Sequence, residues 1–229
     1  MKATIHILLA LIAVAITACS DDDYYHYGDF RYDMVTYMGR DKTSGSDIYI
    51  NYPANDNPAT TLIDPSASAS ASASASSSDI AVGDRGLLNY VVDSRNNYNS
   101  LNITVRGFTQ AITDSLRYTH NIESLAMDSI RLNSIWRTGE YINMYCRVKY
   151  TDNVRLLALV MDYDTWHQDT VHCYLSHNMM GAQAYFWRRC YMSFNISSVW
   201  NLQSCRVVRV HLNDVTYPDH QYYDFIKTN

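Results

Sequence analysis

The sequence predicts an all-β protein, and three observations support this fold class. Apolar and polar residues alternate in many short segments, which is the pattern of strands with one buried and one exposed face. Tyrosine, which favours strands, occurs 20 times, whereas glycine and proline occur only 8 and 4 times. Beyond the N-terminal segment, no stretch keeps a long helical period. With 229 residues, 47% of them hydrophobic, the chain can form one large domain or two small ones.

Residues 1–18 have the form of a secretory signal peptide. Lys2 precedes an apolar run at positions 5–16, and small residues separate this run from Cys19. A membrane-spanning helix is the alternative, although the uncharged stretch at 3–20 has 18 residues, the short end of the roughly 20 that span a bilayer. We therefore predict export and removal of residues 1–18.

The residues that end the signal peptide resemble a bacterial lipobox, Ile16-Thr17-Ala18-Cys19. The resemblance implies that the thiol of Cys19 takes a diacylglyceryl group, that the chain is cut before this residue, and that the new amino group is acylated. Two lipid signals anchor a protein stably, whereas one chain binds with only about 10⁴ M⁻¹. Because the net charge is −5, attachment cannot be electrostatic, and we expect the lipid on Cys19 to be the membrane contact.

An acidic segment, Ser20-Asp21-Asp22-Asp23, follows the cysteine directly. It resembles the tag that sends lipoproteins of the Bacteroidetes group to the outer face of the outer membrane, which implies display at the cell surface. The alternative is that residues 19–27 are a solvated tether that leaves the body facing the periplasm. The predicted location is the outer membrane in both cases.

Residues 28–115 contain four or five short strands, which predict a small barrel or sandwich. In the first strand Phe30, Tyr32 and Met34 alternate with polar residues, which predicts one dry and one wet face. Between the strands lies Ser66–Ser78, an Ala-Ser alternation without large apolar groups, which predicts a mobile loop. The other strands are expected at 47–52, 87–92 and 98–105.

Residues 128–229 contain a set of strands sized for a β-sandwich. Residues 116–127 carry polar residues at irregular spacing and are predicted to be a linker, with a short helix as the alternative. At 141–150, Ile142, Met144, Cys146 and Val148 share one apolar face. Further strands are expected at 154–161, 171–175, 185–196, 206–215 and 222–226.

Four cysteines follow the export signal, and in an oxidising compartment they allow three complete pairings. Strand parity places Cys146, Cys173 and Cys190 inside the sandwich and Cys205 outside it. We expect Cys205 to be unpaired and the three inner cysteines to be thiols packed as small hydrophobes. One inter-sheet disulfide among these three is the alternative.

Over nearly the whole length after the signal, the chain resembles the NigD-like lipoproteins of Bacteroidetes. The shared elements are Cys19 with its acidic tag, Gly28-Asp29-Phe30, Gly83-Asp84-Arg85 leading into Asn89-Tyr90, and Trp136-x-x-Gly139-x-Tyr141-Ile142-Asn143. The resemblance implies an N-terminal OB-like barrel, which we place at 28–115, and a C-terminal β-sandwich. The family is associated with bacteriocin production, where an immunity role was suggested, and most members have no assigned activity.

Charge argues against nucleic acid as a partner, although OB-like barrels often bind single strands. Residues 28–115 carry six Lys and Arg against ten Asp, so phosphate would be repelled. The chain also lacks common catalytic signatures such as Gly-x-Ser-x-Gly and His-Glu-x-x-His. We therefore predict no enzyme, no catalytic residue, no cofactor and no metal site, and we interpret His167, His172 and His177 as surface or loop histidines.

Two function classes remain. The first is a lipid-anchored, non-catalytic envelope protein that acts through interactions at the outer membrane, as a bacteriocin-immunity-like protein would. The second is a surface carbohydrate-binding lipoprotein, because Tyr185, Trp187 and Tyr191 share one strand face and would stack on sugars if that face is exposed. Packing of these rings in the core is the alternative. The partner is thus an envelope protein or a glycan.

Overall fold

Five strands of the N-terminal half close into a barrel in the computed structural model, which describes residues 30–54, 57–68, 80–150 and 156–227. Their order is β1-β2-β3-β5-β4, with β1 also paired to β4 and with β3 parallel to β5. This arrangement is that of an OB-like barrel, as predicted. The strands are β1 (Phe30–Arg40), β2 (Asp47–Asn51), β3 (Thr60–Asp64), β4 (Arg85–Asn97) and β5 (Ser100–Gln110).

One short element continues from β3 at the end of the barrel. This 3-10 helix, η1, spans Pro65–Ser68 and includes the first residues of the predicted Ala-Ser loop. The rest of that loop, 69–78, lies outside the described residues.

The dry face of β1 is the opposite of the predicted one. Val35 and Tyr37 pack in the barrel core, whereas Phe30 and Tyr32 are 48% and 61% exposed. The reason is that the first residues of β1 lie outside the core, so alternation there does not mark an inward face. Met34 is buried on the other face of β1, where it lines a cavity together with side chains of the sandwich.

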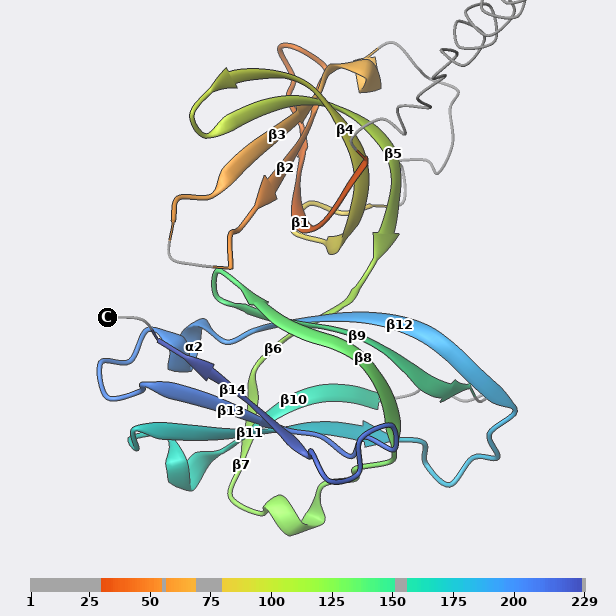
Figure 1. The fold of residues 1–229 in the computed structure, drawn as a ribbon, viewed down its shortest axis with the longest axis vertical. Coiled ribbons are helices and arrows are strands. Elements are labelled where there is room, and N and C mark those ends of the chain that lie inside the picture. The colour runs from red at the N-terminus through yellow and green to blue at the C-terminus, as the bar shows by residue number, and fades with distance from the viewer. Residues whose placement is uncertain (1–29, 55–56, 69–79, 151–155, 228–229) are drawn as a thin grey trace, which may run out of the picture.

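Two sheets form the second half and pack face to face as a β-sandwich (Figure 1). One has the order β14-β13-β11-β10-β7 and the other the order β6-β12-β9-β8. The four-stranded sheet lies between the barrel and the five-stranded sheet (Figure 1). The strands are β6 (Ile112–Ser115), β7 (Arg117–Thr119), β8 (Ile130–Thr138), β9 (Tyr141–Tyr150), β10 (Leu156–Asp162), β11 (Thr170–Asn178), β12 (Phe186–Asn195), β13 (Val207–His211) and β14 (Tyr222–Ile226).

Three short helical segments connect strands of the sandwich: η3 (Ile122–Ser124), η4 (Tyr163–Thr165) and α2 (Ser197–Trp200). Among the described residues, no helix is long and apolar enough to cross a membrane.

The predicted boundary between the domains is wrong by a few residues, and the predicted linker at 116–127 is part of the sandwich. β6 pairs in parallel with β12, and β7 pairs in parallel with β10. The chain therefore enters the sandwich at Ile112 and contributes one strand to each sheet. Strands this short carry too few alternating residues to be distinguished from a polar connection in the sequence.

The sandwich core is filled by the residues that alternate inward, as predicted for β9, whose Ile142, Met144, Cys146 and Val148 are fully buried. β10 is buried from Leu157 to Met161 without alternation, as expected for a central strand.

The four cysteines of the described residues are thiols, in agreement with the expectation. Cys146 and Cys173 are fully buried and Cys190 packs against the core from a partly buried position. The outward placement of Cys205 is wrong, since it is 1% exposed. Cys205 precedes β13, so strand parity does not apply, and its Sγ donates to the carbonyl of Val207 at 3.6 Å.

Candidate binding groove

A groove of about 620 Å³ opens at one end of the barrel, where the start of β1 meets the β2–β3 connection and the β4–β5 turn. Its lining is polar: Arg31 and Asp33 come from β1 and Arg95 from β4, together with asparagine amides. Tyr98, at the β4–β5 turn, is 85% exposed on the rim. We call this hollow the barrel groove.

One hydrogen bond joins two polar side chains of the barrel groove. The hydroxyl of Tyr90 donates to Oδ2 of Asp33 at 2.6 Å. Burial, followed by this hydrogen bond to a carboxylate, raises the pKa of Tyr90, so the phenol stays protonated and keeps donating at neutral pH. The groove therefore presents fixed acceptors and donors beside exposed aromatic rings, a combination suited to recognition.

A second hollow of about 300 Å³ continues from the barrel groove toward the sandwich. The two share Tyr32, Asp33 and Asn51, and the second adds Trp136 and Thr138 of β8. Both domains thus line the connected hollows.

Arg85 joins the two domains beneath this surface. It is fully buried at the start of β4, and its guanidinium donates to Thr36 of the barrel and to Thr138, Asn143 and Ser193 of the sandwich at 2.6–3.3 Å. Burial lowers its pKa to about 10, which leaves it charged at neutral pH.

Tyrosine rings complete the surroundings of Arg85. The guanidinium carbon lies 3.7 Å from the ring centroid of Tyr141 and 5.7 Å from that of Tyr52. These rings stabilise the buried charge through cation–π interactions. Arg85 therefore helps to fix the orientation of the barrel on the sandwich, and its partner Thr138 lines the second hollow.

The β8–β9 hairpin supports the groove wall. The amide of Gly139 donates to the carbonyl of Pro53 at 2.8 Å, and Arg137 donates to the carbonyl of Ala54 at 2.6 Å. Gly139 has φ +54°, a left-handed conformation that glycine adopts without strain.

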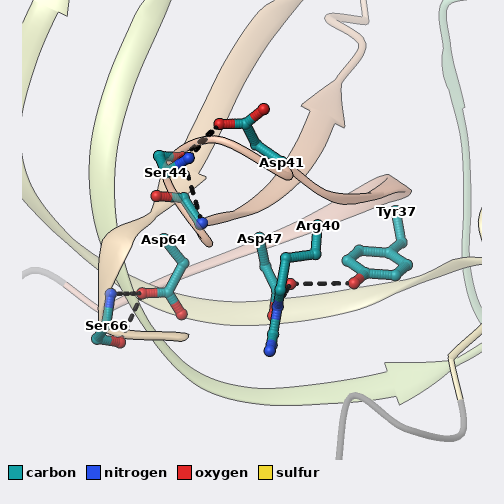
Figure 2. Close-up of polar contacts among 8 residues, drawn as sticks. Tyr37, Arg40, Asp41, Ser44, Asp47, Asp64 and Ser66 are labelled. Carbon is teal, nitrogen blue, oxygen red and sulfur yellow. Dashed lines mark hydrogen bonds and ion pairs between the residues drawn. The ribbon is translucent and has the colours of Figure 1, made fainter. Parts of the chain in front are cut away.

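The part of the barrel around the β1–β2 turn carries a second polar cluster (Figure 2). Buried Asp47 accepts from the hydroxyl of Tyr37 at 3.0 Å and from Nε and Nη2 of Arg40 at 2.9 and 3.0 Å. Asp64, directly opposite Asp47 on β3, accepts from the amide and hydroxyl of Ser66. These side chains and the Ser66 amide meet the hydrogen-bonding needs of both carboxylates within the chain. We therefore interpret the cluster as structural support for the barrel.

The predicted site residues Cys19, Ser20, Asp21, Asp22 and Asp23 lie outside the described residues, so their roles remain predictions.

The three histidines singled out in the sequence, His167, His172 and His177, are not grouped as metal ligands. His167 is exposed, whereas His177 is fully buried, which corrects its interpretation as a surface or loop residue. Nδ1 of His172 lies 3.0 Å from Nε2 of His211, a partner that sequence spacing did not suggest. In the described parts of the chain, no three His, Cys, Asp or Glu side chains are grouped to hold a metal ion.

The aromatic face of β12 points away from the core. Met192 and Phe194 fill the core, whereas Trp187 and Tyr191 lie half-buried on the opposite face and Tyr185 is 61% exposed. The ring of Tyr191 stacks on Tyr145 of β9 with centroids 4.7 Å apart.

Arg85 is the residue whose role sequence reasoning missed. The signal was a cation two residues before a predicted apolar strand, but its partners Thr36 and Ser193 are 49 and 108 positions away.

Comparison with known proteins supports the fold. A protein of unknown function from Bacteroides vulgatus is similar, with 16% identity, a TM-score of 0.66, and coverage of 87% of this chain and 90% of that one. A NigD-like immunity protein from Bacteroides caccae has 18% identity, a TM-score of 0.57, and coverage of 89% and 100%. A candidate lipoprotein from Bacteroides fragilis has 11% identity, a TM-score of 0.55, and coverage of 86% and 96%. No curated protein sequence matches the chain.

A protein-family model matches the second half of the chain. Residues 113–225 match the NigD-like C-terminal beta sandwich domain, and this range begins within β6 and ends within β14. The matched domain is the one that contributes Trp136 and Thr138 to the second hollow. The second half of the chain is thus a NigD-like C-terminal sandwich domain, and an OB-like barrel lies in front of it.

Proposed function

We propose that this protein is a non-catalytic, lipid-anchored protein of the outer membrane that binds a partner in the barrel groove and in the second hollow that continues from it toward the sandwich. The observation that carries the proposal is this pair of connected hollows, in which polar and aromatic side chains of the barrel meet Trp136 and Thr138 of the sandwich. A preorganised surface of this kind loses little conformational entropy when it binds a partner.

The predicted targeting segment at the N-terminus supports the same proposal. The lipobox at Cys19 and the acidic tag at Asp21–Asp23 predict a lipid anchor and the outer membrane. A similar structure is described as a NigD-like immunity protein, which is consistent with a protein that acts by contact with another molecule at the envelope.

The lipid anchor is tested by labelling cells with radioactive palmitate. The wild-type chain should incorporate label and partition into the membrane fraction, and Cys19→Ala should do neither because the thiol is the site of diacylglyceryl transfer. Wild-type levels of label in Cys19→Ala would contradict the lipoprotein assignment.

The groove is tested by placing a photo-crosslinking amino acid at Tyr98, on the groove rim, or at Tyr217, which is 59% exposed but lies in the sandwich, away from the groove lining. Irradiation of intact cells should give a discrete adduct at position 98 and none at 217. Equal adducts at both positions would mean that the groove is not the contact surface.

A carbohydrate is the second candidate partner. The observation that favours it is the pair of exposed rings at Tyr32 and Tyr98 beside asparagine amides, which suits stacking on a sugar and hydrogen bonding to its hydroxyls. A glycan array probed with the mature chain carrying Cys19→Ala tests this. Binding that Tyr98→Ala abolishes would favour a glycan over a protein in the groove.

A further inference from the structure

Three arginines stand side by side on the outer face of the four-stranded sheet. Arg131 of β8 pairs in register with Arg147 of β9, and Arg147 pairs with Arg189 of β12. Their side chains share a face because cross-strand partners project to the same side, and the alternate residues of β9 fill the core. Adjacent strands are about 4.8 Å apart, so this arginine row spans about 10 Å.

The arginine row has no acidic partner within the described residues: no hydrogen bond or ion pair joins Arg131, Arg147 or Arg189 to a carboxylate. The guanidinium of Arg131 lies 4.5 Å over the ring of Trp187, and Lys149 Nζ lies 5.8 Å from the same ring. Like charges on directly opposed strand positions destabilise a sheet. A chain of net charge −5 thus gathers four cations where they repel one another.

The row ends at a strand edge without a partner strand. β9 pairs along the whole of β12, from Phe186 to Asn195. On its other side, β12 pairs with β6 only from Met192 to Asn195. In the part of the chain that the structure describes, the backbone from Phe186 to Tyr191 therefore faces outward along this edge, with Phe186 56% exposed. Such an edge is a template for another strand.

Edge charges often guard a sheet against aggregation, and Arg188 and Arg189 would suffice for that purpose. Protection of an edge does not require Arg147, which lies on the interior strand β9, and Arg131 lies on β8 at the opposite edge of the sheet. The extension of the positive charge across three strands indicates a surface for an anionic ligand. Arginine and tryptophan together are also the residues that dominate protein–protein contact energies.

We propose that the open edge of β12 and the arginine row bind an acidic, extended segment of a protein partner by strand addition. This surface is distinct from the proposed binding site, because none of its residues lines the barrel groove or the second hollow. The edge distinguishes among polyanions, because backbone amides pair in register with a polypeptide and not with a polysaccharide or a nucleic acid. Carboxylates at alternate positions of the added strand would face Arg189 and continue the row with opposite charge.

The test uses the mature chain carrying Cys19→Ala and a synthetic ten-residue peptide in which glutamate alternates with threonine. Isothermal titration should show binding that weakens with added salt, since the attraction is between exposed charges. Hydrogen exchange should show new amide protection at 186–191. Arg147→Glu should weaken binding about tenfold or more. The matched variant Arg106→Glu, at an exposed position on β5 of the barrel, should bind the peptide as tightly as the parent does.

Two further probes separate strand addition from charge alone. The same peptide N-methylated at alternate residues keeps its carboxylates but cannot pair, and it should lose binding. Equal binding of the methylated peptide, tighter binding of a sulfated polysaccharide or a single-stranded oligonucleotide, or no binding of the glutamate peptide would each overturn the proposal. The proposed function is tested separately, by palmitate labelling and by the adduct at position 98. Failure of strand addition would therefore not count against it.

Discussion

Arg85 shows how one residue sets the relation of two domains. Its neighbours Thr36, Thr138, Asn143 and Ser193 are neutral acceptors, so the charge is held by hydrogen bonds and tyrosine rings. Arg85→Met removes the donors and leaves buried acceptors with fewer partners. We expect the free energy of unfolding to fall by about 2–3 kcal/mol.

Urea titration followed by tryptophan fluorescence measures this effect. The matched variant Arg95→Met, on the exposed end of the same strand, should change stability by less than about 0.5 kcal/mol. Equal stability of the parent and Arg85→Met would show that the domain junction does not depend on the guanidinium.

The His172–His211 pair makes stability depend on pH. Burial, and then the neighbouring His172 and Arg209, lower the pKa of His211 to about 4, below its ordinary value of 6.5. Between these two values the unfolded chain binds a proton that the folded chain does not, so stability is complete above about pH 6.5 and falls toward pH 4. Because the ring is half-exposed, solvent screening limits the loss to about 1–2 kcal/mol.

Chemical denaturation at pH 7.5, 6, 5 and 4.5 follows this loss. His211→Gln should flatten the fall in that window, whereas His167→Gln, at an exposed histidine, should retain the parent's pH dependence. A fall of the same size in His211→Gln would assign it to other groups.

Among the larger elements, the β8–β9 hairpin also helps to position the barrel on the sandwich. A Cβ added at Gly139 would lie 3.0–3.2 Å from Tyr52, the ring that also contacts Arg85, and the residue has a positive φ. Gly139→Ala should lower the free energy of unfolding by about 2 kcal/mol, from backbone strain plus displacement of Tyr52.

Gly181→Ala separates these two causes. Gly181 has φ +70°, but a Cβ there meets nothing within 4 Å. Gly181→Ala should lose only the strain contribution of about 1 kcal/mol, and thermal unfolding of both variants measures the two losses. Equal losses at both positions would mean that Tyr52 moves without a penalty.

At the scale of the whole molecule, the acidic tag predicts an orientation. If Asp21–Asp23 direct display, protease added to intact cells should remove the folded body from the cell surface. Replacing the three aspartates with alanine should favour a protected form that is cleaved only after the outer membrane is opened. Protection of the wild-type chain in intact cells would place the body on the periplasmic face.

The sequence alone was enough to predict the all-β class and the alternating face of β9, because side chains along one strand obey a fixed period. Where alternation ran past the core, as at Phe30 and Tyr32, the same rule assigned the wrong face. Contacts between residues that are far apart in the sequence could be seen only in the folded structure. Arg85 reaches Ser193, and Arg131, Arg147 and Arg189 form one row, because strand register and domain docking place them together, and neither leaves a local pattern in the chain.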